Sequence, residues 1–135
     1  MLFGEVLVPE AVHHEFLAKD RGAREAALAA APWLRVTQLA DPRQIESYPG
    51  LDLGEQETLA LAEERGARLV LIDERKGRMQ ARRLGITLGG TLGTLLSAKD
   101  AGLLETIRES LERLQQAGLH LGPSLVAQTL ELAGE

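Results

Sequence analysis

The sequence of 135 residues contains no cysteine, few aromatic residues and no long apolar run. Without cysteine the chain can form neither disulfide bonds nor thiolate metal sites. Aromatic residues make up 3%, which argues against a platform that stacks the bases of single-stranded nucleic acids. No apolar run approaches the roughly 20 residues that span a bilayer, and no signal peptide precedes the first elements. We therefore expect no membrane contact and a cytoplasmic location.

The charge of the chain is acidic overall but unevenly distributed. The formal net charge is −5, which by itself argues against a general nucleic-acid binder. Residues 65–83, however, hold seven basic and two acidic side chains, a local net charge of +5 that leaves −10 for the rest. This segment is either a solvated helix face or a surface that holds a phosphate backbone close to a bound metal.

The stretch Arg68–Ile72 is the strongest indication of the fold. Its four consecutive large apolar residues are too few for a helix and do not alternate with polar ones. This pattern predicts a strand covered on both faces, as is usual in a parallel sheet. Asp73 comes next and would stand at the carboxyl edge of the sheet, where open α/β sheets bind their ligands. The alternative is that Asp73 caps the helix that follows.

Strands and helices alternate along the rest of the chain. Strands are predicted at residues 6–8, 33–39 and 86–88, and helices at about 9–19, 23–31, 51–65, 75–84, 92–101, 103–117 and 123–132. Thr91 is the expected N-cap of the helix at 92–101. The alternation predicts one domain, residues 1–135, of the α/β class with a parallel central sheet.

Two glutamates stand on helix faces that are otherwise apolar. Glu15 shares its stripe with Ala11, Val12 and Phe16, which follow the three- and four-residue spacing of a helix face. A buried carboxylate needs a partner such as a cation, but Glu15 would equally fit the edge of the stripe, in water. Glu55 has capping-box spacing from Asp52 and also shares a face with apolar residues of its helix. The two roles of Glu55 do not exclude each other.

Three carboxylates, Glu15, Glu55 and Asp73, therefore stand out as candidate metal ligands. Carboxylates without histidine or cysteine suit a hard cation, Mg²⁺ or Mn²⁺, and the three histidines show no ligand spacing. Such a cation can activate water and stabilise the charge that develops when a phosphodiester is hydrolysed. A plainer interpretation is an α/β domain whose acidic residues are helix caps and surface charges.

Four segments in this order resemble the PIN-domain family over nearly the whole chain. They are VPEAVHHE at 8–15, GEQETLALA at 54–62, LIDERK at 71–76 and GTLG at 90–93. They look closest to a VapC-like, nucleic-acid-binding branch of that family. The resemblance implies a three-layer α/β/α fold with a parallel central sheet and a ribonuclease that depends on Mg²⁺ or Mn²⁺. It also implies, for many members, a homodimer that acts as the toxin of a toxin–antitoxin pair.

The resemblance assigns roles to the three acidic positions. The family's helix glutamate falls on Glu15, its mid-chain acidic residue on Glu55 and its strand-end aspartate on Asp73, so these three are expected to bind the metal and to be catalytic. In this hypothesis, basic residues next to the strand end hold the RNA phosphates: Arg75, Lys76 and Arg78.

One departure from the family pattern concerns the beginning of the chain. PIN domains start with a central strand that carries the first metal-binding aspartate, but this sequence starts after that element, and no aspartate precedes Asp20. Either the start is misplaced, or the protein lacks this strand and one ligand. In the second case, the open sheet edges invite a partner subunit. A catalytically inactive module that binds nucleic acid or protein is therefore the alternative function. Glu74, which neighbours Asp73, is not expected to replace the ligand, since adjacent residues usually point to different sides.

Overall fold

The computed structural model describes residues 2–135 and divides the chain into two compact units. The first unit is Phe3–Gly89, and the second contains Leu2 and residues 90–135. The prediction that the whole chain forms one domain stays a prediction. Among residues 2–135, no helix is long and apolar enough to cross a membrane.

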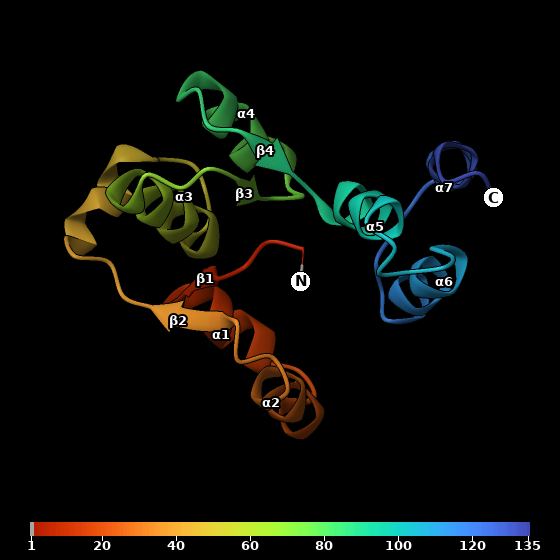
Figure 1. The fold of residues 1–135 in the computed structure, drawn as a ribbon. Coiled ribbons are helices and arrows are strands. Elements are labelled where there is room, and N and C mark those ends of the chain that lie inside the picture. The colour runs from red at the N-terminus through yellow and green to blue at the C-terminus, as the bar shows by residue number, and fades with distance from the viewer. Residues whose placement is uncertain (1) are drawn as a thin grey trace. The chain divides into compact units, whose positions relative to one another are not determined.

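The first unit contains four short strands, all of which pair in parallel. Its elements are, in order, β1 (Val6–Pro9), α1 (Glu10–Leu17), α2 (Arg21–Ala29), β2 (Leu34–Thr37), the 3-10 helix η1 (Pro42–Ser47), α3 (Leu53–Arg65), β3 (Val70–Leu71), α4 (Arg75–Arg83) and β4 (Leu88–Gly89), as Figure 1 shows. Strand β1 pairs with β2, and β3 pairs with β4. Helices separate the paired strands in sequence, so the α/β class and the parallel pairing are confirmed.

Helix α3 carries the core of the first unit. It contacts β1 and β3 as well as helices α1 and α4. Leu59 and Ala60 of α3 are fully buried and pack with Tyr48, Val70 and other apolar residues. The Tyr48 hydroxyl donates a hydrogen bond to the carboxylate of Glu63, so this aromatic ring is buried with its polar end satisfied.

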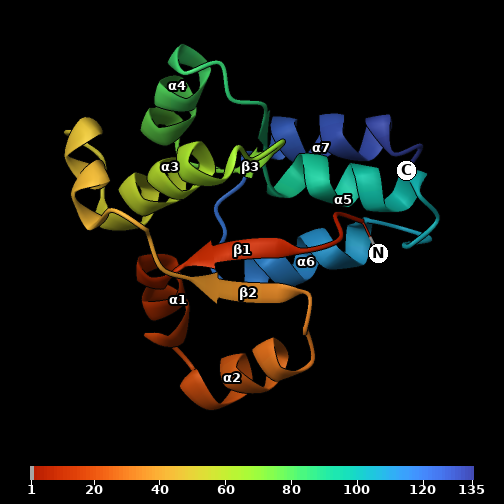
Figure 2. The same ribbon diagram turned by 60° about the vertical axis from the view of Figure 1, so that its left-hand side comes forward.

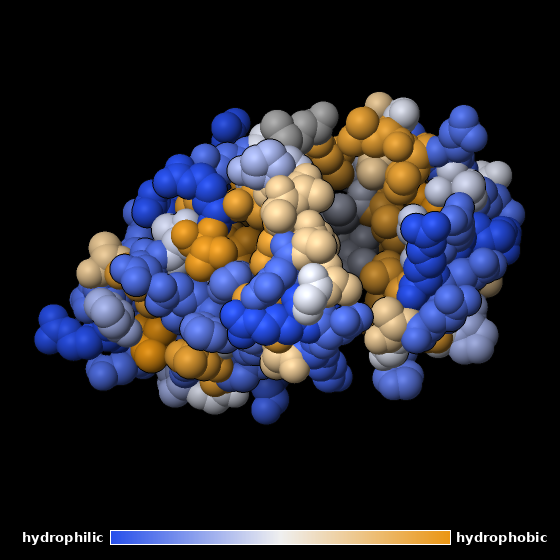
Figure 3. All heavy atoms as spheres, turned by 90° about the horizontal axis from the view of Figure 1, so that it is seen from below, coloured by the Kyte–Doolittle hydropathy of each residue, from blue (hydrophilic) through white to orange (hydrophobic). Residues whose placement is uncertain are grey.

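Strand β3 differs from the prediction, because only one of its faces is covered. Val70 and Ile72 are buried, whereas Leu69 and Leu71 are 36% and 41% exposed. Side chains alternate along a strand, and the helices of this unit cover the Val70 and Ile72 face through α3 and α4. The expectation of a strand buried on both faces was therefore wrong. Hydrophobic side chains also lie exposed among hydrophilic ones on the surface seen in Figure 3.

In its described residues the second unit contains three helices, α5 (Thr91–Asp100), α6 (Arg108–Gln116) and α7 (Pro123–Leu132). Helices α5 and α7 pack side by side (Figure 2), and Ile107, Leu111 and Thr129 are its buried residues. Two expectations were wrong here. Gly90 is the N-cap of α5, and Thr91 is its first helical residue. The helix expected from residue 103 begins at Arg108, because a distant carboxylate holds the preceding backbone.

That carboxylate belongs to Glu135. It accepts hydrogen bonds from the backbone N–H of Ile107 at 2.8 Å, from the Thr106 hydroxyl and from Lys99 Nζ at 3.0 Å. A further bond comes from the backbone N–H of Arg108 at 3.3 Å. These donors, led by the Ile107 N–H, lower the pKa of Glu135 from its ordinary 4.5 to about 2. Because the N–H groups at the start of a helix carry partial positive charge, the carboxylate acts as a cap of α6.

We expect the Glu135→Gln variant to be less stable than the wild type at pH 7, with a difference that shrinks in acid. A carboxyl whose pKa is lowered by folding adds stability that is fully present above its unfolded pKa, near 4.5, and is lost as the pH falls towards 2. Urea unfolding at pH 7, 4 and 2.5 measures this difference. Glu131→Gln, an exposed change on α7, is the matched control. A constant difference at all three pH values would contradict the role of the charge.

Candidate functional site

The first turn of α3 is closed by a capping box between Asp52 and Glu55. The Glu55 backbone N–H donates to Asp52 Oδ1 at 2.8 Å, and the Asp52 N–H donates to Glu55 Oε2 at 3.3 Å. The sequence encodes this arrangement directly, because the N-cap and N3 residues are three positions apart. The capping role expected for Glu55 is therefore confirmed.

Glu55 also lines a cleft of about 510 Å³ in the first unit. The cleft lies where the N-termini of α3 and α4 meet, and its lining residues are Gly50, Asp52, Glu55, Glu74, Arg75 and Lys76. Three carboxylates thus share a cleft with two basic side chains. Gly50 has a φ of 84°, a left-handed conformation that suits glycine in the turn before α3.

The surroundings of Glu55 disfavour the ionised form of its carboxyl group. Burial raises its pKa most, and the neighbouring carboxylates of Asp52 and Glu74 raise it further. The Asp52 backbone N–H and the Lys76 ammonium act in the opposite direction. Asp52 and Glu74 therefore each lie close enough to Glu55 to repel its carboxylate, and a cation beside Glu55 would relieve that repulsion.

Glu15 reaches the start of α3 from helix α1. A Cβ atom at Gly54 would lie 2.7 Å from Glu15 Oε1 and 3.2 Å from its Cδ, so only glycine at position 54 lets this carboxylate lie where it does. Glu15 itself is exposed, while Ala11 on its stripe is buried. Of the two positions left open by the sequence, Glu15 therefore occupies the edge of the apolar stripe.

Asp73 and Glu74 form the turn between β3 and α4. Asp73 is exposed and follows Ile72 directly, as expected for the carboxyl end of a strand. Glu74 is the N-cap residue of α4 and lines the cleft, although its side chain makes no capping hydrogen bond. Glu74 was not expected to act as a ligand, because adjacent residues of a strand face opposite ways. The strand has already ended at Leu71, however, and Glu74 is the residue before α4. The helix predicted from residue 75 was the feature of the sequence that could have indicated this position.

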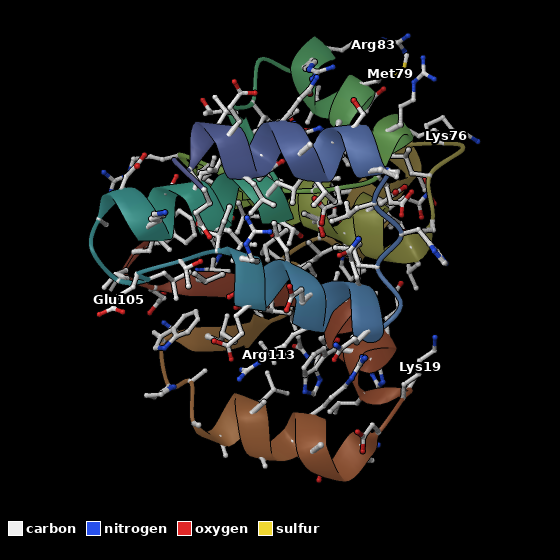
Figure 4. The ribbon with its side chains drawn as sticks, turned by 90° about the vertical axis from the view of Figure 1, so that its right-hand side faces the viewer. Lys19, Lys76, Met79, Arg83, Glu105 and Arg113 are labelled. Carbon is white, nitrogen blue, oxygen red and sulfur yellow. The ribbon has the colours of Figure 1, made fainter. Side chains whose placement is uncertain are left out.

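The three basic residues of the RNA hypothesis lie in two different settings. Arg75 and Lys76 are exposed and line the cleft. Arg78 is half-buried, and its Nη1 donates to the carbonyl oxygens of Ile72 at 2.6 Å and Gly89 at 3.1 Å. Further basic side chains of α4 project outward, as Figure 4 shows for Arg83.

The donor set fits a hard divalent cation in its chemistry. Carboxylate oxygens are the ligands that Mg²⁺ and Mn²⁺ prefer, and Mg²⁺ commonly uses one or two of them and keeps several waters. Among residues 2–135, however, no three or more acidic or histidine side chains are arranged so that together they could hold a metal ion. The roles of Glu15, Glu55 and Asp73 as metal ligands therefore stay predictions.

The residues of the first unit form an α/β structure with parallel strands and an acidic cleft at the start of two helices. A family model described as a PIN domain matches residues 1–135, so the chain belongs to the PIN-domain family. Searches of curated proteins and of solved structures found no match. Membership indicates a nuclease-like function and nucleic-acid binding in general, and PIN domains generally use divalent metal ions.

Proposed function

We propose that this protein is a Mg²⁺- or Mn²⁺-dependent ribonuclease that hydrolyses phosphodiester bonds in RNA. The observation that carries the proposal is the cleft in which Asp52, Glu55 and Glu74 lie beside Arg75 and Lys76. Acidic and basic groups in one cleft suit a reaction in which a cation and a phosphate must meet.

In this proposal the acidic residues hold the cation. Glu55, Asp73 and Glu15 are the expected ligands, and Glu74 adds negative charge to the cleft. When bound, the cation supplies an activated water and stabilises charge on the phosphodiester. Asp52 keeps Glu55 in place through the two capping-box hydrogen bonds. Arg75 and Lys76 hold the RNA phosphates next to these carboxylates by charge attraction.

The alternative is a catalytically inactive PIN module that binds nucleic acid or protein. It is favoured by Arg75 and Lys76, which line the cleft and would attract phosphates without any metal. The two functions differ in one measurable respect, since only the ribonuclease requires a metal for its effect on RNA.

The finer features of the family belong to the same proposal. We propose that the protein is cytoplasmic, forms a homodimer and acts as the toxin partner of an antitoxin protein. We also propose that the two strand pairs belong to one three-layer α/β/α arrangement with a central sheet, since α3 contacts strands of both pairs.

The test is calorimetric titration of the 135-residue chain with Mn²⁺, beside an assay of RNA cleavage with and without EDTA. We expect saturable binding and cleavage that EDTA abolishes. The Asp73→Asn variant should lose both and keep its thermal stability, because the substitution preserves shape and removes charge. RNA binding without any Mn²⁺ binding would support the inactive module instead.

A further inference from the structure

The Arg78 side chain ties together the carboxyl ends of β3 and β4. Its Nη1 donates to the Ile72 carbonyl at 2.6 Å and to the Gly89 carbonyl at 3.1 Å. The Ile72 backbone N–H also donates to Gly89, at 3.0 Å, so the guanidinium extends the parallel ladder beyond its last backbone hydrogen bond. Hydrogen bonds from a charged donor are stronger than those between neutral groups.

The same residue also holds the other side of the Asp73–Glu74 turn. The Arg78 backbone N–H donates to the Glu74 carbonyl at 3.0 Å. The side chain fixes the carbonyl just before Asp73, and the backbone N–H of Arg78 binds the Glu74 carbonyl in an ordinary helical hydrogen bond of α4. The two residues between these hydrogen bonds carry the carboxylates at the strand end and in the cleft.

Close packing of α4 supports this arrangement. A Cβ atom at Gly77 would lie 3.0 Å from Ile72 Cγ2 and 3.5 Å from Cδ of Glu55. The first turn of α4 thus lies directly against the strand end and the cleft glutamate. A half-buried guanidinium at this position needs hydrogen-bond acceptors, and the two carbonyls provide them.

We propose that Arg78 is a positioning residue of the acidic cleft, and not a ligand of RNA phosphates. It holds the Asp73–Glu74 turn in the position from which the carboxylates of this turn, with Glu55, would hold a divalent cation. The inference rests on the proposed metal-dependent function, and it reassigns the residue that the sequence alone placed among the RNA contacts.

The test compares Arg78→Gln and Arg78→Lys with Arg82→Gln, which removes an exposed charge one turn further along α4. Three quantities are measured on the full chain: the Mn²⁺ dissociation constant, the affinity for single-stranded RNA in EDTA, and amide hydrogen exchange of residues 72–75. We expect Arg78→Gln to weaken Mn²⁺ binding by about 10- to 100-fold, as for other residues that orient metal ligands. Exchange at 72–75 should rise about tenfold or more in this variant.

Arg78→Lys should recover part of the Mn²⁺ affinity, because a lysine keeps the donor charge but not the fork of the guanidinium. Arg82→Gln should leave Mn²⁺ affinity and exchange as in the wild type, and both glutamine variants should lose a similar, small share of RNA affinity. Unchanged Mn²⁺ affinity in Arg78→Gln, with a selective loss of RNA binding, overturns the inference and makes Arg78 an RNA contact. A wild-type chain that does not bind Mn²⁺ overturns the proposed function as well, and unaltered exchange in Arg78→Gln overturns the positioning role by itself.

Discussion

The rate of RNA cleavage is expected to fall about 100- to 1,000-fold in the Glu55→Gln variant. A bound metal contributes several kcal/mol of transition-state stabilisation, and each tenfold in rate corresponds to about 1.4 kcal/mol. Glutamine has the shape of glutamate and still accepts the Asp52 N–H, so the capping box of α3 remains. The free energy of unfolding should change by no more than about 1 kcal/mol. Initial cleavage rates and urea unfolding at the same pH measure the two effects.

The control for this prediction is Glu46→Gln, which removes an exposed carboxylate of η1 outside the cleft lining. It should cleave RNA at the wild-type rate, because a change of one unit in net charge has little effect by itself. Equal cleavage by the Glu55→Gln variant and the wild type would remove Glu55 from the mechanism. A parallel loss of folding would indicate that its cap, and not its charge, was the important property.

The largest change in stability is expected for Leu59→Ala. Leu59 is fully buried in α3 and packs in the cluster that contains Tyr48 and Val70. Truncating a buried leucine costs about 2–5 kcal/mol, partly for lost apolar burial and partly for the cavity that remains. This is a large share of the roughly 5–15 kcal/mol that stabilises a typical domain. Urea unfolding followed by circular dichroism measures the loss.

Leu53→Ala is the matched control, because it is the same substitution in the same helix at a residue that is 51% exposed. It should change the free energy of unfolding by no more than about 0.5 kcal/mol. If both substitutions lowered the free energy of unfolding equally, the buried face of α3 would not be the one described. A Leu59→Ala variant that folds but no longer binds Mn²⁺ would show that the cleft depends on the packing of this helix.

Local signals in the sequence were sufficient for most of the secondary structure and for part of the site. The Asp52–Glu55 box joins residues three apart, so its two hydrogen bonds depend on little beyond the first turn of α3. Pro123 marks the start of α7 in the same way. The order of strands and helices gave the α/β class and the parallel pairing, and the four motif segments indicated the PIN-domain family that the family model shows.

Contacts between segments that are distant along the chain could not be predicted from the sequence. The start of α6 is delayed to Arg108 because the carboxylate of Glu135, 27 positions away, takes the backbone N–H of this residue and of Ile107. No periodicity in residues 103–117 encodes that contact. The exposure of Leu69 and Leu71 has the same origin, since an apolar run specifies a strand but not how many of its faces find a neighbour.

The sequence by itself determined the fold class, the family, the cap of α3 and the acidic and basic residue types near the strand end. Only the tertiary structure decided that Glu74 lines the cleft, that Glu15 lies at the edge of its stripe, and that the Arg78 guanidinium binds the carbonyls of Ile72 and Gly89. The physical reason is the range of the interactions. Caps and strand propensity act over a few residues, whereas the direction of a side chain in a cleft depends on backbone segments that only packing brings together.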